Sequence, residues 1–471
     1  MPRINRLFGP AALLWPLWLG AQTQLTTQSQ PGLAQILERL DKLERDNRAL
    51  SEEVRSLRAR LDSTADSKTQ PTPDGETVPG AGTANAAAGA PATVEEKLDI
   101  QGKRIDEQAQ TKVEASQRFP VRLTGMALFN AFLNSKQNGG VEYPAVVAAP
   151  GAGFAGATMR QTIIGLEFRG PSTVWGGNVH GSVYMDFAAG ATNSAMRLRT
   201  GSIEIDWKNR NVMVGIEKPI FNPREPSSLA QLAVSPLTGS GNLWLWLPQA
   251  RVEQDFSLAR ATGLRARLGV VETHETGPYA GTNFTGPVEA ARPGLEGRFE
   301  FYHNLDDDRR LEIASGFHTS QTHVAGTSVA SSLFSFDWFF NPWRRLEFTG
   351  AYYNGQNVTP LGAGYQQGYG IYGYGEHRQV EPVHSQGGWA QVTFRVAPRL
   401  DFHFFSGQQD DRNEDLNAGR IAKNLIFGGN LYYHLAPNVI VGLETTQLRT
   451  LYIGQGVRIN NHYDLALGYL F

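Results

Sequence analysis

The sequence lacks cysteine, has few charged residues and contains no long apolar run after its first residues. With 0 cysteines in 471 residues, disulfide scaffolds, thiol catalysis and Cys-ligated metals are excluded. A formal net charge of −2 leaves no strongly basic surface, so nucleic acid is not an expected partner. No run of about 18 apolar residues follows the N-terminus, which excludes a helical membrane protein. A membrane barrel remains open, because alternating strands average their two faces to a modest mean hydropathy, here −0.32.

The first residues have the composition of a secretory signal peptide. Arg3 and Arg6 precede a short apolar stretch at 7–19, and small residues follow it up to Ala21. We therefore expect residues 1–21 to be a signal peptide that is removed after Ala21. A membrane anchor is the alternative, but the stretch is short and two prolines interrupt it.

A heptad repeat occupies residues 22–62. The a positions are Leu33, Leu40, Asn47, Val54 and Leu61, and the d positions are Ile36, Leu43, Leu50 and Leu57. This spacing predicts a coiled coil and hence an oligomer, without deciding between two and three chains. Residues 63–93 are rich in Ala, Gly, Pro and Thr and predict a flexible linker, and 94–117 predict a short helix.

From residue 118 to 471 the pattern changes to period two, and sixteen candidate strands follow one another. The expected strands are 122–135, 159–170, 178–189, 197–208, 211–218, 243–256, 262–274, 293–303, 309–319, 329–340, 344–354, 385–396, 399–408, 420–435, 438–450 and 459–471. Short connections, such as 208–210 and 436–437, alternate with long ones at 136–158, 219–242, 275–292, 355–384 and 409–419. An up-and-down barrel with short turns at one end and loops at the other produces this alternation, whereas a sandwich or propeller does not.

The faces of the strands indicate which side meets lipid. On 262–274, Leu264 and Leu268 oppose Arg265 and Arg267. A sixteen-stranded interior is too wide to fill with side chains, so the apolar faces must point outward and the charged faces must line water. We therefore predict an all-β fold: a 16-stranded antiparallel transmembrane β-barrel with an N-terminal α-helical coiled coil.

The last strand has an aromatic, apolar face. Tyr463, Leu465, Tyr469 and Phe471 share this face and Asp464 lies on the other. The segment resembles the closing strand of bacterial outer-membrane barrels, whose aromatic end is a signal for the barrel-assembly machinery. The resemblance implies the same role for Phe471.

No catalytic, metal-binding or cofactor-binding motif is found in the sequence. The histidines show no HExxH-like spacing, and there is no GxSxG or GxxxxGK[ST]. An enzyme in a barrel wall needs a Ser/His or Asp/His set on one face, and no such set is evident. The acidic run 306–308 predicts a solvated turn in preference to a cation site. We expect neither an enzyme nor a metal or cofactor site.

The long connection 219–242 is expected to narrow the channel. Leu229 and Leu232 help to make it too apolar for a solvated loop, so it should fold onto the inner wall and bring Arg224 and Glu225 to a constriction. A lid at the rim is the alternative. The other expected pore-lining residues are Arg199, Arg251, Arg265, Arg267, Arg298, Arg395, Glu253 and Glu296.

The expected pore-lining charges predict opposed basic and acidic walls that orient polar solutes, with arginines suited to carboxylates. The expected function is therefore a passive outer-membrane channel for small polar solutes that prefers anionic, carboxylate-bearing ones, with the coiled coil in the periplasm. A non-selective general porin is one alternative. A barrel that serves adhesion or envelope anchoring is the other.

Three stretches of the chain carry a family resemblance: VRLTGMALFNAFLNS, the connection 219–242 with its following LWLWLPQARVEQ, and the ending ALGYLF. Together they resemble the DcaP-like trimeric outer-membrane porins, which are distantly similar to the phosphate-selective porin O and P family. The resemblance covers roughly 119–471, and the coiled coil resembles the helical extension of the group. It implies a sixteen-stranded homotrimer that passes small anions, dicarboxylates especially. The chain has no dense Arg/Lys ladder, which argues against phosphate selectivity.

Overall fold

The structure, a computed structural model, describes residues 121–471 apart from 149–150, 174, 190–193, 274–292, 325–326, 364–366 and 374–378. The predicted signal peptide, coiled coil, linker and short helix lie outside the described residues. Within the described ranges, no helix is long and apolar enough to cross a membrane.

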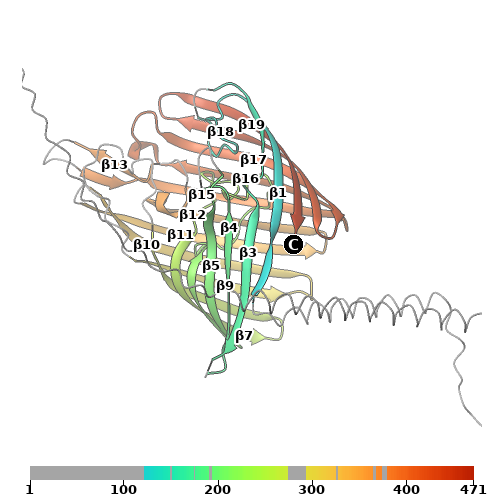
Figure 1. Ribbon diagram of the computed structural model, residues 1–471. Coiled ribbons are helices and arrows are strands. Elements are labelled where there is room, and N and C mark those ends of the chain that lie inside the picture. Colours follow the sequence, from blue (N-terminus) through green and yellow to red (C-terminus); the bar gives the residue numbers. More distant parts are fainter. Residues whose placement is uncertain are drawn as a thin grey trace, which may run out of the picture. The chain divides into compact units, whose positions relative to one another are not determined.

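The described residues form one closed antiparallel sheet (Figure 1). Its strands are β1 (Val121–Asn134), β2 (Phe154–Thr158), β3 (Ile163–Ser172), β4 (Asn178–Asp186), β5 (Arg197–Trp207), β6 (Arg210–Glu217), β7 (Leu247–Ala259), β8 (Thr262–Val271), β9 (Gly294–Asn304), β10 (Arg310–Val324), β11 (Thr327–Trp343), β12 (Leu346–Gln356), β15 (His384–Ala397), β16 (Leu400–Asp411), β17 (Ile421–Ala436), β18 (Val439–Tyr452) and β19 (Gly456–Leu470). These are 17 strands, but β2 and β3 both pair with β1 and form one interrupted wall strand, which leaves sixteen.

The barrel closes where β1 pairs with β19, from Met126 opposite Leu470 to Asn134 opposite His462. Phe471 extends this closure, because its N–H donates to the Gly125 carbonyl at 3.1 Å and its carbonyl accepts from the Gly125 N–H at 3.0 Å. The predicted all-β barrel of sixteen antiparallel strands is therefore confirmed for this part of the chain.

Two connections at the loop end are shorter than predicted. β10 and β11 continue to Val324 and Thr327, and β18 and β19 are separated only by 453–455. The polar pair His323 and Ser328 continues the β10–β11 ladder where the sequence pattern no longer shows apolar alternation. The alternation of short and long connections is thus less strict than the sequence indicated.

The loop end carries some local structure of its own. The connection between β12 and β15 contains a short hairpin of β13 (Tyr369–Tyr372) and β14 (Gln379–Pro382), preceded by a 3-10 helix at Thr359–Leu361. A second 3-10 helix spans Asn413–Asp415 between β16 and β17. β7 begins at Leu247, not at the predicted residue 243, because Leu243 and Trp244 pack as part of the preceding loop.

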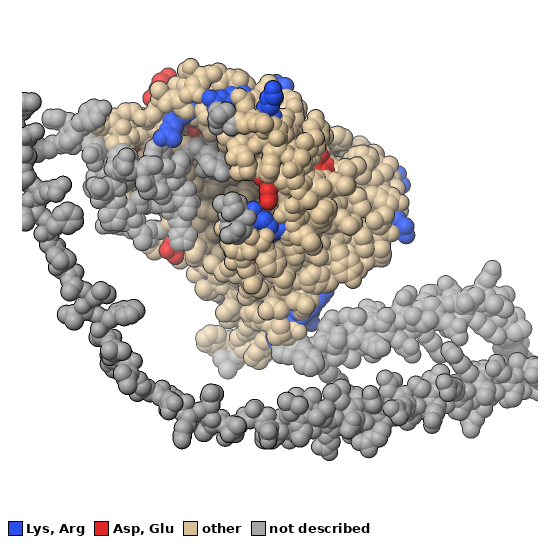
Figure 2. All heavy atoms as spheres, turned by 45° about the horizontal axis from the view of Figure 1, so that its top comes forward, with Lys and Arg blue, Asp and Glu red and all other residues tan. Residues whose placement is uncertain are grey.

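The two faces of the wall differ as the alternation predicts. On the outer face, Leu268, Phe299 and Leu465 are 50%, 55% and 45% exposed, whereas Asp337 and Asp464 on the inner face are 0% and 5% exposed. Most of the visible outer surface is neither acidic nor basic; charged groups lie beside the hollow and at the margins of this surface (Figure 2). An apolar outer belt around a polar interior is typical of barrels that cross a membrane.

Candidate pore constriction

The connection between β6 and β7, residues 218–246, lies inside the barrel against its wall; we call it the inner loop. The Asn130 side chain on β1 donates to the Leu229 carbonyl at 2.9 Å, and the Asn430 side chain on β17 donates to the Ser227 carbonyl at 2.7 Å. Gln161, between β2 and β3, accepts from the Leu232 N–H at 2.7 Å. Polar wall side chains thus satisfy backbone groups of a non-regular segment that is enclosed by the barrel.

Apolar contacts, and a glycine in the wall that leaves room for the loop backbone, also hold the inner loop against the wall. Leu229 packs with Leu128, Tyr432 and Ile440 of the wall, and Leu232 joins the same cluster. At Gly407 on β16, a Cβ would lie 2.3 Å from the Ser240 carbonyl oxygen, so the close approach of the loop requires glycine there. The loop therefore lies against the wall and does not form a lid at the rim.

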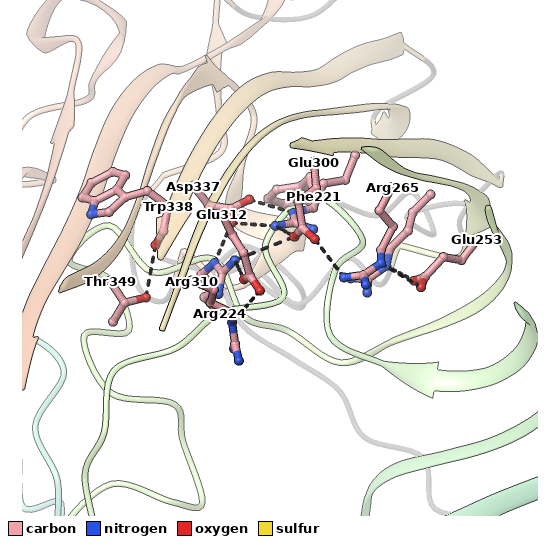
Figure 3. A network of polar contacts seen from close by, with 12 residues as sticks. Phe221, Arg224, Glu253, Arg265, Glu300, Arg310, Glu312, Asp337, Trp338 and Thr349 are labelled. Atoms are coloured by element: carbon pink, nitrogen blue, oxygen red, sulfur yellow. Dashed lines mark hydrogen bonds and ion pairs between the residues drawn. The ribbon is translucent and has the colours of Figure 1, made fainter. Parts of the chain in front are cut away.

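Arg224 attaches the loop to the wall of β10 and β11 (Figure 3). Its guanidinium contacts Asp337 at 2.7 Å and Glu312 at 2.5 Å. Arg298, only 1% exposed, bonds the same Asp337 through two nitrogens at 2.8 Å each. Arg224 and Arg298 were both expected to line the pore, but these contacts hold the loop in place, and Arg298 is covered.

Glu296 is also buried behind the inner loop. Its carboxylate, 0% exposed, accepts from the Ile220 N–H at 2.7 Å and bonds His318 Nδ1 at 2.9 Å. The other ring nitrogen of His318 lies 2.8 Å from the Ser320 hydroxyl. The structure thus brings together a Ser–His–Glu set that the sequence did not reveal, but all three side chains are buried and the carboxylate binds the loop. No group of residues that could hold a metal ion is found among the described residues.

β5 carries an arginine pair on the lumen face of the wall, with side chains that are 28% (Arg197) and 12% (Arg199) exposed. Arg197 Nε and an Arg199 terminal nitrogen each lie 2.8 Å from the Asp186 carboxylate, which is fully buried. The Arg199 guanidinium also stacks on Trp246 at 4.5 Å, and that of Arg197 lies 5.4 Å from the same ring. Two cations therefore share one anion, and one net positive charge remains at this point of the wall. Arg197 also donates to the Ala233 carbonyl of the inner loop.

A bulge explains why both arginines face inward. The β4–β5 register shifts between Tyr184 and Met185, so Arg199 has no direct partner on β4. Without this shift, Arg199 would share its face with Ile203, which is 59% exposed on the outside. The extra residue lets Arg199 and Glu204 face the same lumen.

Glu225 of the inner loop faces the open lumen, with its side chain 35% exposed. It pairs with Lys218 at 2.7 Å and accepts from the Ser235 hydroxyl at 2.9 Å. The loop thus contributes a paired acid to the narrowed passage.

On strands β7–β9 the acidic and basic side chains alternate with one another and do not form opposed walls. Arg265 on β8 contacts Asp255 on β7 at 2.9 Å and Glu300 on β9 at 2.8 Å, and Arg267 pairs with Glu253. The antiparallel register places these groups directly opposite each other across adjacent strands. The expectation of separate basic and acidic walls is therefore wrong.

Arg251 and Arg395 complete the predicted set. Arg251 on β7 forms no ion pair within the described residues, and its guanidinium donates to the Gln249 side chain at 3.4 Å. Arg395 lies near the turn end and pairs with Glu347 at 2.9 Å. Both face inward, at different heights of the barrel.

The acidic run 306–308 forms a turn, as expected. Asp306 accepts from the Arg309 side chain at 2.8 Å and from the N–H groups of Asp308 and Arg309 at 3.0 and 2.8 Å. The Arg309 guanidinium is the main cause that lowers the pKa of the Asp306 carboxyl. The hydrogen bonds of the Asp306 carboxylate thus stay within its own turn.

Sequence reasoning missed Arg197, Asp186, Lys218 and Trp246. Trp246 lies in the LWLWLPQ stretch, which was assigned to a strand. The pair Trp244 and Trp246 directly after the long connection was the one sequence feature that could have indicated Trp246 as a site residue. The shared carboxylate depends on strand register and left no signal in the sequence.

A closed barrel of sixteen antiparallel strands with one loop folded into its lumen is the fold of the bacterial outer-membrane porins. No family model and no curated protein matches the sequence. Among solved structures, the outer-membrane channel DcaP of Acinetobacter baumannii is similar with a TM-score of 0.61 at 16% identity, over 74% of this chain and 97% of that one. An anion-selective porin from Comamonas acidovorans gives a TM-score of 0.51 at 10% identity, over 74% and 99%. The predicted resemblance to DcaP-like porins is confirmed at the level of fold.

Proposed function

We propose that the protein is an outer-membrane porin: a passive channel for small polar solutes that prefers anionic, carboxylate-bearing ones. The apolar outer belt supports membrane insertion, because exposed leucines and phenylalanines on all sides of a barrel are stabilised by lipid and not by water. The lumen, lined by charged side chains and narrowed by the inner loop, supports passage of small polar solutes.

The observation that carries the anion preference is the Arg197–Arg199 pair on a single buried carboxylate. Its net positive charge faces the open part of the lumen, where Arg199 and Trp246 form a cationic, partly apolar surface. Arginine matches the two oxygens of a carboxylate in geometry and charge. The anion selectivity of the porin from Comamonas acidovorans supports the same direction for a barrel of this fold.

We further infer a homotrimer with its N-terminal coiled coil in the periplasm. The predicted heptads support an oligomer, and the resemblance to DcaP-like porins supports three chains. Recognition of Phe471 by the barrel-assembly machinery is part of the same proposal.

Purified full-length protein in planar bilayers should give stepwise conductance, and liposomes that contain it should swell faster in succinate than in neutral sugars of similar size. Folded protein without conductance would overturn the channel and favour adhesion or envelope anchoring. Equal swelling rates for succinate and sugars would leave a general, non-selective porin.

A further inference from the structure

The outer face of β15–β19 and β1 carries a groove of about 1170 Å³. Phe404, Phe427, Leu443 and Tyr463 line it and are 60%, 37%, 53% and 49% exposed. At Gly429 on β17 no side chain rises from the sheet, and a Cβ there would meet the Phe404 ring at 3.1 Å. The missing side chain lowers the floor of the groove between the Phe404 and Tyr463 rings, which lie three strands apart.

A polar cluster lies beside this groove towards the loop end. Arg449 on β18 is exposed, and its guanidinium carbon lies 5.3 Å from the centre of the Phe427 ring that lines the groove. Its Nε donates to Gln447 at 2.8 Å, and Gln447 donates to Asn461 on β19 at 2.9 Å. In the described part of the chain, no carboxylate pairs with Arg449. A cation held in position at the end of an apolar groove is complementary to an amphiphile with an anionic head.

We propose that this groove binds a phosphorylated membrane lipid, with an acyl chain between Phe404 and Tyr463 and a phosphate on Arg449. The proposal rests only on the membrane insertion in the proposed function, not on the solute preference. Guanidinium groups bind phosphate oxygens through charge-assisted hydrogen bonds, and the aromatic ring beneath Arg449 fixes its position. A second copy of the chain is the other conceivable occupant. It would bury Arg449 at a protein interface, where an unpaired charge is costly unless the partner supplies a carboxylate.

Native mass spectrometry of the full-length protein in detergent, with added hexa-acylated lipid A as the probe, tests this site. The wild-type protein should retain one lipid per chain. Arg449→Gln should lower the retained fraction about tenfold at the same lipid concentration, because one charge-assisted contact is lost. Ala131→Phe, which fills the groove from β1, should have a similar effect through the acyl chain.

Arg412→Gln is the matched control, since Arg412 is an exposed arginine at the loop end that pairs with Glu414 outside the groove. Equal lipid retention by the wild type and both groove variants would overturn the proposal. Lipid-free trimers that dissociate on Ala131→Phe would also overturn it and assign the groove to a second copy. Heat-modifiable migration verifies that each variant is folded. The Arg449→Gln variant is also tested for conductance. Normal conductance with lost lipid retention locates the defect in the lipid site, whereas loss of conductance points to a failure of the channel.

Discussion

Replacing Arg199 with glutamine should weaken the anion preference by a factor that follows from Coulomb's law. The change removes one of the two cations on Asp186 and with it the net positive charge of the cluster. Asp186 keeps Arg197 at 2.8 and 3.0 Å and the Ala188 N–H at 3.0 Å, so the carboxylate stays satisfied and the barrel should fold.

The magnitude follows from Coulomb's law. An ion that passes about 7 Å from a unit charge in water interacts with it by about 0.6 kcal/mol, which is close to RT. The sign is opposite for an anion and a cation, so removal of the charge should lower the anion-to-cation permeability ratio about sevenfold. Screening reduces the effect at high salt, because the Debye length falls to about 3 Å at 1 M.

The assay is the zero-current potential across a planar bilayer under a KCl gradient at low salt. Asp186→Asn is the mirror variant, because it leaves both guanidinium groups without a carboxylate and should raise the same ratio. Arg344→Gln is the control, since Arg344 is a turn residue whose side chain is 73% exposed. If Arg199→Gln has the potential of the wild type, or if both lumen variants shift it in the same direction, the cluster does not set selectivity.

Three further changes test the inner loop and the closure of the barrel. Arg224→Ala removes the contacts to Asp337 and Glu312 and should raise single-channel conductance and its fluctuations; an unchanged conductance would mean that the loop is held without this contact. Gly407→Val should displace the loop, because even a Cβ would lie 2.3 Å from the Ser240 carbonyl, and should change the size limit in liposome swelling while the barrel stays heat-modifiable. Gly125→Val places a side chain against a backbone oxygen of β3 at 2.3 Å and should reduce the yield of folded barrel; a normal yield would contradict a tight closure.

The wall of the barrel was predictable because each strand carries its own evidence. On β19, Tyr463, Leu465 and Tyr469 are 49%, 45% and 50% exposed on the outer face, as period two indicated. Which residues share a face depends only on alternation within one strand. The apolar face must point outward because the interior of a sixteen-stranded barrel is too wide to be filled by side chains.

The candidate site was less predictable because it depends on relations between strands. Arg199 faces inward only because a bulge shifts the β4–β5 register, and no residue type marks that bulge. Arg265 meets Glu300 because of the pairing of β8 with β9, which a list of charged residues does not contain. Opposed walls were inferred from the charged residues assigned to the water face of each single strand, whereas the register between strands brought acids and bases together.

The interior is divided between two tasks, and the residue types of the wall explain the division. The loop contacts small or amide side chains at Gly407, Asn424, Asn430 and Gln391, which let a backbone approach and satisfy its polar groups. Strands β5–β8 instead carry long charged side chains such as Arg251 and Arg265, and there the loop backbone is bonded at fewer points, among them the Ala233 carbonyl that accepts from Arg197. A loop that satisfies most of its backbone on the amide-rich side of the wall leaves the charged side chains of the described β5–β8 strands to face a solute. Selectivity should therefore respond to charges on β5–β8, and channel width to the residues that hold the loop.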